Sequence, residues 1–431
     1  MSKRVVVVGG GWSGVAAAHA AYLAGADSVV LVERTDYLLG TGLVGGIMRN
    51  NGRFTAAEEM IAMGGGLMFE ICDEVSVHRN FDFPGHKHAS LYDVTSIEPA
   101  VNKALVEEGI DVRLIHRVTK INISNGSIDS IHMENGETIE GDMFIDTTGT
   151  VGPQKNCTRY GSGCVMCIVR CPTFGPRTSI SGLAGAEDRN GFRKDGEVGV
   201  MSGSCKLSKD SLAPALSRQL SEEGLVIVPL PELTAQKMYS KLGAKACQQY
   251  ALPEYADNII LLDTGQAKLM TSYVDLEDLR TVPGFEQARY EDPYSGSLGN
   301  SIRYLDVTRR DNTMKVECDV DNLYCGGEKA GLLVGHTEAI VTGTLAGHNA
   351  VRQLAGRAPI EIPHDLATGD AIAHVRTEMD KPGGMSQKYT FSGSVFFERM
   401  KERNRYTADV DLIKKRVAST GFNDVFSTAV V

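Results

Sequence analysis

The segment at residues 4–34, RVVVVGGGWSGVAAAHAAYLAGADSVVLVER, constrains the fold more than any other part of the chain. Its apolar, β-branched run at 5–8 predicts a buried parallel strand, which leads directly into a G-x-G-x-x-G motif. The alanine-rich stretch at 15–24 predicts a helix, and the run at 28–32 predicts a second strand. Glu33 follows that strand, about twenty residues after the glycines. The segment therefore predicts a strand-helix-strand unit that binds a dinucleotide.

Each residue of the motif has a physical task in such a unit. Gly9 permits a tight turn, Gly11 lets the backbone approach a pyrophosphate, and Gly14 lets the helix pack closely on the strand. The helix N-terminus then points its N–H groups at the phosphates. Glu33 is placed to accept hydrogen bonds from a ribose. A bare glycine turn is the alternative, but the acid and the flanking strand and helix favour a nucleotide site.

The bulk composition limits the possible classes of protein. With 431 residues and 47 glycines, the chain is long enough for two or three cores and suits an α/β nucleotide-binding protein. A formal net charge of -10 argues against a broad nucleic-acid footprint. No run of eighteen apolar residues occurs, and the first strand leaves no space for a signal peptide. We therefore expect a soluble, cytoplasmic protein.

The order of elements continues the pattern of a dinucleotide-binding domain. A glycine-rich loop at 34–46 is too irregular for a helix, and an amphipathic helix is predicted at 92–108. Two hairpin strands at 118–124 and 128–134 meet at an Asn-Gly turn. A further strand at 142–145 leads into Asp-Thr-Thr-Gly. A capped helix is also expected at 55–72, interrupted by three glycines.

The C-terminal part contains a counterpart to this domain. Residues 321–328, DNLYCGGE, predict a short strand, a glycine turn and an acid, and residues 336–353 predict a helix with small residues on one face. In the middle, we expect helices at 211–223 and 233–250 and a strand at 258–262. The fold class is α/β, a Rossmann-like domain with a parallel sheet, a βαβ unit and a hairpin insertion, plus an inserted α+β substrate domain.

Five stretches resemble the FAD-binding domain of the flavoproteins with two dinucleotide-binding folds: GGGWSG, LVERTDYLLGTGLVGG, FIDTTG, RCPTFGPR and DNLYCGGEKAG…EAIVTGTLAGHNAVR. Within that superfamily, the chain is similar to the glucose-inhibited-division-type and folate-dependent tRNA-uridine-modifying flavoenzymes, and to heterodisulfide-reductase-A-like oxidoreductases. The resemblance covers roughly residues 1–150 and 300–355 well. It implies FAD as cofactor, bound by Gly9, Gly11, Ser13, Gly14, Glu33, Arg34, Gly42, Val118, Thr148, Gly149, Gly327 and Glu328.

The resemblance also divides the chain into four parts. Residues 1–155 would be the first part of the FAD-binding domain, and residues 156–310 an inserted substrate and redox domain. Residues 311–358 would close the FAD-binding domain, and residues 359–431 would form a C-terminal helical tail. The apolar C-terminal residues 426–431 are expected to dock on the body or on a second subunit of a homo-oligomer.

Candidate acid/base residues follow from the expected fold. The helix at 336–353 would point its N-terminus at the flavin, which places His336 and Glu338 near the reacting ring. A helix N-terminal acid can instead serve only as a cap. His86-x-His88 could suggest a metal pair, but without a third ligand we interpret both as loop histidines.

Four of the nine cysteines cluster with the spacing C-x6-C-x2-C-x3-C-P. Three interpretations stay open. Cys157, Cys164, Cys167 and Cys171 could bind a [4Fe-4S] cluster, although the first interval is longer than in ferredoxin-type runs. Cys164 and Cys167 could instead form a catalytic, redox-active disulfide. The third interpretation is buried, inert thiols.

The main functional hypothesis is an FAD-dependent oxidoreductase that passes electrons between flavin and an unidentified substrate, with a second redox centre at the cysteine segment. Its partner would be a small molecule or an electron-carrier protein. The alternative is an FAD-dependent, folate-linked enzyme that modifies a tRNA uridine. A third hypothesis is a non-catalytic electron-transfer subunit. The acidic charge favours the first hypothesis, and we expect no membrane partner.

Overall fold

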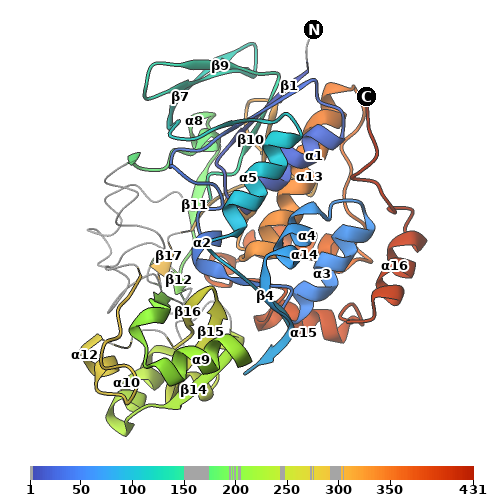
Figure 1. Cartoon of the computed structure of the whole chain (residues 1–431). Helices are drawn as coiled ribbons and strands as arrows, with labels where there is room; N and C mark the ends of the chain where they lie inside the picture. The colour runs from blue at the N-terminus through green and yellow to red at the C-terminus, as the bar shows by residue number, and fades with distance from the viewer. Residues whose placement is uncertain are drawn as a thin grey trace.

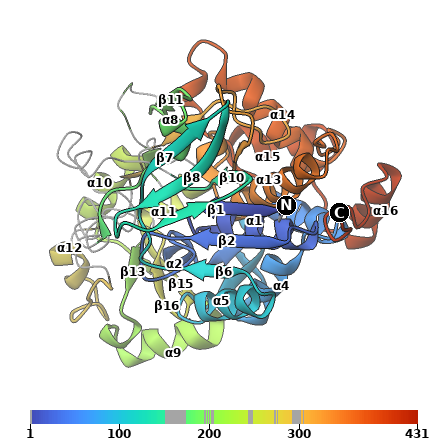
Figure 2. The same cartoon turned by 90° about the horizontal axis from the view of Figure 1, so that it is seen from above.

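The computed structural model describes residues 3–149, 174–193, 196, 198, 200–201, 205–242, 248–271, 274, 276–291, 302–303 and 305–431. Its central element is a five-stranded parallel sheet in the order β19 (Leu323–Cys325), β10 (Met143–Asp146), β1 (Arg4–Val8), β2 (Ser28–Val32) and β6 (Asp111–Arg113). Figure 2 shows β10, β1, β2 and β6 side by side. Because β19 comes from the late part of the chain and pairs with β10, segments far apart in the sequence build one sheet.

Two helices pack against each other beside this sheet, α1 (Trp12–Leu23) and α13 (His336–Leu354) (Figure 1). Their contact depends on small residues. A Cβ atom on Gly343 would collide with the carbonyl oxygen of Ser13, and one on Gly347 with that of Ala17. The two backbones therefore approach as closely as glycine allows, which explains the small-residue face of the second helix.

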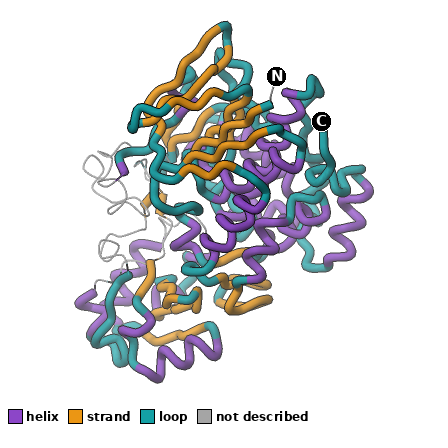
Figure 3. Tube along the Cα trace, turned by 45° about the horizontal axis from the view of Figure 1, so that its top comes forward, coloured by secondary structure: helices purple, strands orange, loops and turns teal. Residues whose placement is uncertain are grey.

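A three-stranded antiparallel sheet follows as an insertion before β10. It consists of β7 (Val118–Ser124), β8 (Ser127–Met133) and β9 (Thr138–Glu140), and the first two strands form the predicted hairpin. Asn125 and Gly126 both have positive φ angles, as a tight Asn-Gly turn requires. Figure 3 shows these strands near one end of the molecule, with most helices on the opposite side.

The segment between β2 and β6 corrects two predictions. The expected helix at 92–108 is shorter, α5 (Ile97–Glu107), because Tyr92 ends the strand β5 (His86–Tyr92). That strand pairs with β3 (Ile47–Met48) and β4 (Ser76–Phe83). The glycine-rich loop contains one helical turn, α2 (Gly42–Gly45), where we expected none. Two further helices, α3 (Gly52–Ala62) and α4 (Leu67–Glu74), flank the predicted glycine break.

The middle of the chain forms a separate antiparallel sheet with its own apolar core. Its strand order is β13 (Cys205–Leu207), β16 (Gln266–Leu269), β15 (Asn258–Thr264) and β14 (Leu225–Pro229). The helices α9 (Pro214–Glu223), α10 (Glu232–Leu242), α11 (Glu254–Asp257) and α12 (Leu276–Arg280) accompany it. Shorter elements precede and follow this region in the sequence. They are α8 (Ile180–Leu183), β11 (Asp188–Asn190) and β12 (Val200–Met201) before it, and β17 (Ile302–Arg303) and β18 (Asp306–Thr308) after it.

Three helices form the C-terminal part, α14 (Ala367–Met379), α15 (Ser394–Glu402) and α16 (Val410–Ser419). The buried carboxylate of Glu59 caps α14, because it accepts the backbone N–H groups of Ala367 and Thr368 at 2.9 Å each. The chain end docks on the body of the same chain, which is one of the two alternatives predicted for residues 426–431. Phe426 is fully buried, and the N–H of Val430 donates to the carbonyl of Ala24 at 2.9 Å.

The docked tail covers a histidine of α13. His348 is 1% exposed and packs edge-on against Phe426, with ring centroids 5.4 Å apart. Neither ring nitrogen has a hydrogen-bond partner among the described residues. Burial lowers the pKa of His348 from 6.5 to about 4.

This pKa predicts a specific pH dependence of stability. The folded protein holds His348 neutral, so the unfolded chain binds one more proton between about pH 6.5 and pH 4. Stability is therefore lost as the pH falls through that window, by about 3 kcal/mol for this group. We expect His348→Leu to remove this part of the pH dependence, measured by urea unfolding across the window. His364→Leu, at an exposed histidine, is the control and should leave the slope unchanged.

Candidate functional site

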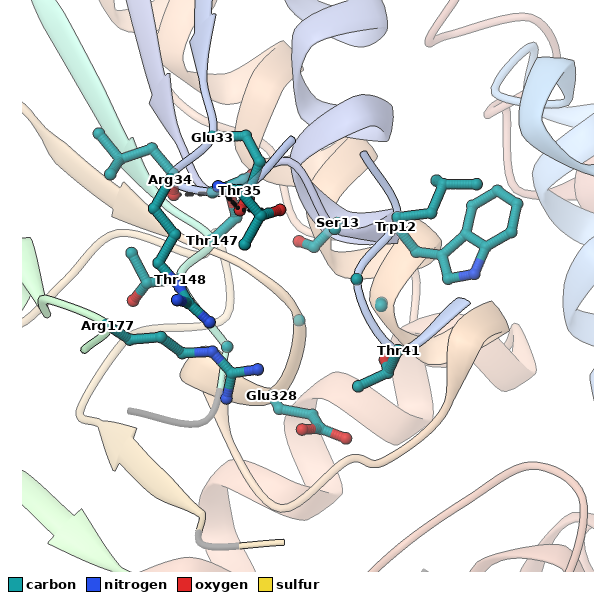
Figure 4. Close-up of a pocket in the computed structure, with 18 of the residues that line it drawn as sticks. Trp12, Ser13, Glu33, Arg34, Thr35, Thr41, Thr147, Thr148, Arg177 and Glu328 are labelled. Atoms are coloured by element: carbon teal, nitrogen blue, oxygen red, sulfur yellow. Dashed lines mark hydrogen bonds between the residues drawn. The ribbon is translucent and has the colours of Figure 1, made fainter. Parts of the chain in front are cut away.

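A cavity lies where the carboxyl ends of β1, β2 and β10 meet the N-terminus of α13, and the space free of protein atoms there, part of it open to solvent, is about 1040 Å³. This is the edge at which open parallel sheets bind ligands. Figure 4 shows its side chains, which come from the glycine turn, the end of β2, the turn after β10 and the turn after β19.

The glycine turn forms one wall, and its three glycines differ in what surrounds them. Gly9 has a φ of +105°, and a Cβ there would lie 2.5 Å from the carbonyl oxygen of Thr147. A Cβ on Gly14 would collide with the carbonyl oxygen of Gly9, since helix α1 lies directly on the strand. A Cβ on Gly11 would meet no protein atom within 4 Å, so this side of the residue faces open space in the cavity. The geometry of Gly9 and Gly14 agrees with a tight turn and with close packing, and the approach of Gly11 to a phosphate stays a prediction.

Glu33 lies at the end of β2, where its carboxylate organises the turn around it. One oxygen accepts the N–H of Gly10 at 2.8 Å, and the other accepts both the N–H and the hydroxyl of Thr35 at 2.9 Å. A carboxylate has about four acceptor sites, and three are used here. One acceptor site is therefore left for a ribose hydroxyl, as the sequence predicts.

Two arginines lie along one side of the cavity. Arg34 donates from Nη1 to the carbonyl of Gly175 at 2.7 Å, and its guanidinium lies near that of Arg177 (Figure 4). Arg117, which also lines the cavity, is held by Glu134 at 2.7 Å. This wall therefore presents positive charge, which suits the phosphates of a dinucleotide.

Two further turns line the cavity, the turn after β10 and the turn after β19. Asp146 is fully buried and accepts the N–H and hydroxyl of Thr148, at 3.1 and 2.7 Å. This holds Thr148 and Gly149 at the edge of the cavity. Gly327 and Glu328 come from the second turn, and the Gly327 N–H donates to the hydroxyl of Thr342 at 2.8 Å.

His336 begins α13 and lines the cavity. Its Nδ1 lies 3.3 Å from the hydroxyl of Tyr92, and its ring lies 6.1 Å from that of Trp12. The helix adds a partial positive charge at this end. An imidazole at this position could hold or move a proton at the cavity wall.

Glu338 lies two residues further along the same turn, but it does not line the cavity. It is fully buried, and both of its oxygens lie within 3.1 Å of Nε of Arg53 in α3. It also accepts the hydroxyl of Thr390 at 2.7 Å and the N–H of Phe391 at 2.8 Å. The geometry is that of a buried ion pair that holds three segments together, and the acid/base role of Glu338 stays a prediction.

The turn α2 is held against the cavity from both sides. The Tyr92 hydroxyl donates to the carbonyl of Gly42 at 2.7 Å, and Gly45 lies against His336, where a Cβ would not fit. From the inserted sheet, Lys206 donates to the carbonyl of Leu43 at 3.2 Å. Lys268, its cross-strand partner, donates to the carbonyl of Val44 at 2.9 Å. The inserted sheet therefore contacts α2, which directly follows the lining residues Gly40 and Thr41, through two ammonium groups.

We expect Lys268→Met to weaken flavin binding by about tenfold without unfolding the protein. The substitution keeps the length of the buried side chain but removes the donor to Val44, so α2 loses one of its supports next to His336. A flavin titration followed by fluorescence measures the effect. Lys237→Met is the control, because that lysine pairs with Asp278 on the exposed side of the inserted region. An unchanged flavin affinity in Lys268→Met would show that α2 does not depend on this contact.

Two observations test whether the cavity suits FAD. The Ser13 hydroxyl is buried at the cavity wall and has no partner among the described residues, so a donor and acceptor is available next to the glycine turn. Gly11 leaves open the space that a pyrophosphate would fill. Together with the arginine wall, these features fit FAD, which would supply redox chemistry to the site.

The structure brings most of the predicted cofactor residues together. The cavity is lined by Gly9, Gly11, Ser13, Glu33, Arg34, Val118, Thr148, Gly149, Gly327, Glu328 and His336. Gly14 and Gly42 lie behind the lining, Gly14 as the packing residue of α1 and Gly42 through its carbonyl contact with Tyr92. Sequence reasoning missed several lining residues: Trp12, Thr35, Leu39, Gly40, Thr41, His116, Thr147, Thr178, Gly335 and Ala339. Thr147 and Gly335 could have been predicted from the sequence. Thr147 lies in the Asp-Thr-Thr-Gly motif, and Gly335 directly precedes the helix predicted at 336–353.

The cysteine segment cannot be placed in this picture. Cys157, Cys164, Cys167 and Cys171 lie outside the described residues, so both the cluster and the disulfide stay untested predictions. Within the described part of the chain, no group of three or more His, Cys, Asp or Glu side chains could hold a metal ion. His86 is buried against Phe83 and Tyr250, and its Nδ1 lies 2.8 Å from the Asn50 amide, while His88 contacts Asn80.

The fold and the cavity together define the class of protein: a flavoprotein with a Rossmann-like, FAD-binding domain. The model of a protein family described as "Glucose inhibited division protein A" matches residues 4–221 and 253–358. The chain belongs to this family. The match confirms the resemblance predicted from the sequence, and with it the class of flavin-dependent enzymes.

Solved structures and a curated relative add to this result. The chain is similar to GidA from Aquifex aeolicus in one crystal form, with a TM-score of 0.71, 16% identity, and coverage of 99% of this chain and 74% of that one. A second crystal form gives a TM-score of 0.69, 15% identity, and coverage of 99% and 76%. At this identity the likeness shows the fold. The curated relative is named methylenetetrahydrofolate--tRNA-(uracil-5-)-methyltransferase TrmFO, from Bacillus licheniformis, and is 32% identical over 108 residues. The matched segment covers 24% of this chain and 23% of that protein.

Within the described part of the chain, none of the helices combines the length and the apolar character needed to cross a bilayer.

Proposed function

We propose that this protein is an FAD-dependent enzyme that modifies a uridine base of tRNA in the cytoplasm, with a folate-type one-carbon donor as co-reactant. The family match carries this proposal, because it spans the glycine turn, the turn after β10 and the closing turn and helix, all of which line one cavity. The printed activity of the Bacillus licheniformis relative supports the substrate class. The hypothesis of an oxidoreductase with a small-molecule substrate is the coarser form of this function, and the tRNA alternative fits the family better.

The residues of the cavity have proposed roles in this function. Gly9, Gly11 and Ser13 would hold the pyrophosphate of FAD at the N-terminus of α1, and Glu33 would accept a ribose hydroxyl. Gly327 and Glu328 would close over the opposite side of the cofactor. Bound FAD would supply the two-electron redox chemistry.

His336 is the proposed proton-transferring residue at the cavity wall. It lies at the start of α13, within hydrogen-bond reach of Tyr92, and lines the same cavity as the glycine turn. Glu338 is proposed instead to position this helix through Arg53. We expect His336→Asn to retain FAD but to lower the rate of base modification by about a hundredfold or more.

The four-part division of the chain forms part of the proposal. Residues 1–155 and 311–358 would build the FAD-binding domain, and residues 156–310 would carry the substrate-facing part. The direct contact of Lys206 and Lys268 with α2 supports this view, because it joins the inserted sheet to the wall of the cavity.

The test is an assay with purified full-length protein, FAD, a reduced nicotinamide, methylenetetrahydrofolate and an unmodified tRNA transcript. Nucleoside mass spectrometry should detect a uridine with added mass, and omission of the tRNA or of the folate should abolish it. A transcript with the modified position changed to cytidine is the control. Flavin turnover that continues unchanged without tRNA, with no modified nucleoside, would favour the small-molecule oxidoreductase instead.

A further inference from the structure

The turn that follows β19 borders two cavities. Gly327 and Glu328 line the flavin cavity, while Ala330, three residues after Gly327, lines a smaller cleft. Four arginines and two acids surround this second cleft: Arg189, Arg309, Arg310, Arg376, Glu317 and Asp380. We propose that this cleft is a binding site for one phosphate group. The site is separate from the flavin cavity and does not rest on the proposed function.

The charges of the cleft do not balance. Asp380 lies 3.2 Å from Arg189 and 3.6 Å from Arg309, and Glu317 lies 3.3 Å from Arg309 and 2.8 Å from Arg376. Three arginines therefore share two carboxylates. With Arg310 included, four positive charges face two negative ones among the residues that line the cleft. The nearby carboxylate of Asp311 acts on Arg310 and Arg376 and leaves a formal excess of +1. An isolated surface pair would need no further explanation, but a cleft with this excess attracts an anion.

Arg310 makes the excess harder to relieve within the protein. It is 3% exposed, and its guanidinium donates to three carbonyl groups rather than to a carboxylate, those of Ala330 at 2.9 Å, Asp311 at 3.1 Å and Ile372 at 3.0 Å. Burial lowers the pKa of Arg310 to about 10, and the nearby charge of Arg376 adds to this. An anion in the cleft would oppose both effects.

Two buried polar atoms at the cleft have no partner among the described residues. The Thr308 hydroxyl is one of them, on a side chain that is 0% exposed, and Nε of Arg189 is the other. Buried polar groups are nearly always hydrogen-bonded, so each unsatisfied one needs a reason. A ligand oxygen in the cleft would satisfy a hydroxyl and a guanidinium donor together. This observation is independent of the charge count and points to the same kind of ligand.

The charge selects a phosphate group, of which one oxygen fits the closed part of the cleft. That part leaves about 10 Å³ for the centre of a water-sized group, so the rest of the phosphate would lie in the open mouth of the cleft. A phosphate monoester or inorganic phosphate carries about -1.5 to -2 charges at neutral pH, opposite in sign to the excess. Arginine also binds phosphate oxygens through paired N–H groups. The source is either free phosphate or a phosphate that protrudes from a larger molecule such as an RNA strand.

The experiment is a calorimetric titration of the full-length protein with inorganic phosphate, at constant ionic strength and with FAD in excess so that the flavin cavity is filled. Two variants locate the site. Arg309→Gln removes the arginine shared by both acids and should weaken phosphate binding by about tenfold or more. Thr308→Val keeps the buried volume and all charges, and should weaken it by about fivefold. Arg403→Gln is the matched control and should have no effect, since that arginine lies just after α15 and pairs with Asp370 of α14.

A second titration distinguishes the two sources. A short RNA oligonucleotide that competes with phosphate in the unmodified protein, but no longer binds in Arg309→Gln, would assign the site to an RNA phosphate. An oligonucleotide that does not compete, with phosphate binding intact, would assign it to free phosphate. The proposal is overturned if the unmodified protein does not bind phosphate, or if Arg309→Gln and Thr308→Val bind it as tightly as the control. If the unsubstituted protein binds phosphate but does not modify tRNA, the result counts against the proposed function and leaves the proposal of a phosphate site standing.

Discussion

Replacement of Gly14 by alanine is expected to destabilise the protein by about 2 kcal/mol, although alanine is the better helix former. In an unconstrained helix, Gly→Ala gains about 1 kcal/mol. Here the new Cβ would collide with the carbonyl oxygen of Gly9, an atom of the backbone that cannot rotate away. Helix α1 would have to move off the strand, against α13 on its other side. Overpacking of this kind costs about 1–3 kcal/mol or more, so the steric cost exceeds the helix gain.

Gly11→Ala is the matched test of this argument, three residues away in the same turn. Gly11 has a φ of -70°, which alanine adopts without strain, and a Cβ there meets no protein atom. We expect the melting temperature of the FAD-free protein to be unchanged, while flavin affinity falls by at least tenfold because the methyl group enters the space of the pyrophosphate. The two alanine variants thus separate the effect of helix packing on stability from the effect of the glycine turn on cofactor binding. Equal loss of stability in both variants would contradict the assignment of roles.

The flavin half of the site could be predicted from sequence because its signals are local. The glycine spacing, the acid after β2 and the glycine turn before α13 each depend on residues that are close in the chain. Their contacts are then determined by the parallel pairing of β1, β2, β10 and β19. Predictions failed where a distant partner decided the outcome. The strand β5 extends to Tyr92 because β3 and β4 pair with it, which shortens the helix that the amphipathic pattern predicts.

Residue type and position on a helix were also insufficient to define chemical roles. Glu338 was singled out because it lies in the first turn of a helix aimed at the cavity, and the structure places it in contact with Arg53, 285 residues earlier in the chain. Lys268 was not singled out at all, and its contact with Val44 spans 224 residues. Neither partner could be found from spacing, because the contacts arise only when the central and inserted sheets are assembled.

The ion pair of Arg53 and Glu338 leads to the second large prediction. We expect Arg53→Met to lower the stability at neutral pH by about 3–5 kcal/mol, because it leaves the fully buried carboxylate of Glu338 without its counter-charge. This loss of stability should exceed the effect of breaking an exposed ion pair. Substitution of Lys237, which pairs with Asp278 at the surface, should cost at most about 1 kcal/mol. Urea unfolding of the FAD-free protein measures both.

A double variant distinguishes a buried charge from a simple loss of packing. Arg53→Met combined with Glu338→Gln removes both charges and should recover part of the stability that Arg53→Met loses, because an uncharged amide can still accept from the N–H of Phe391. Urea unfolding of the two variants at neutral pH measures the recovery. If the double variant recovers nothing, Arg53 contributes packing rather than charge compensation.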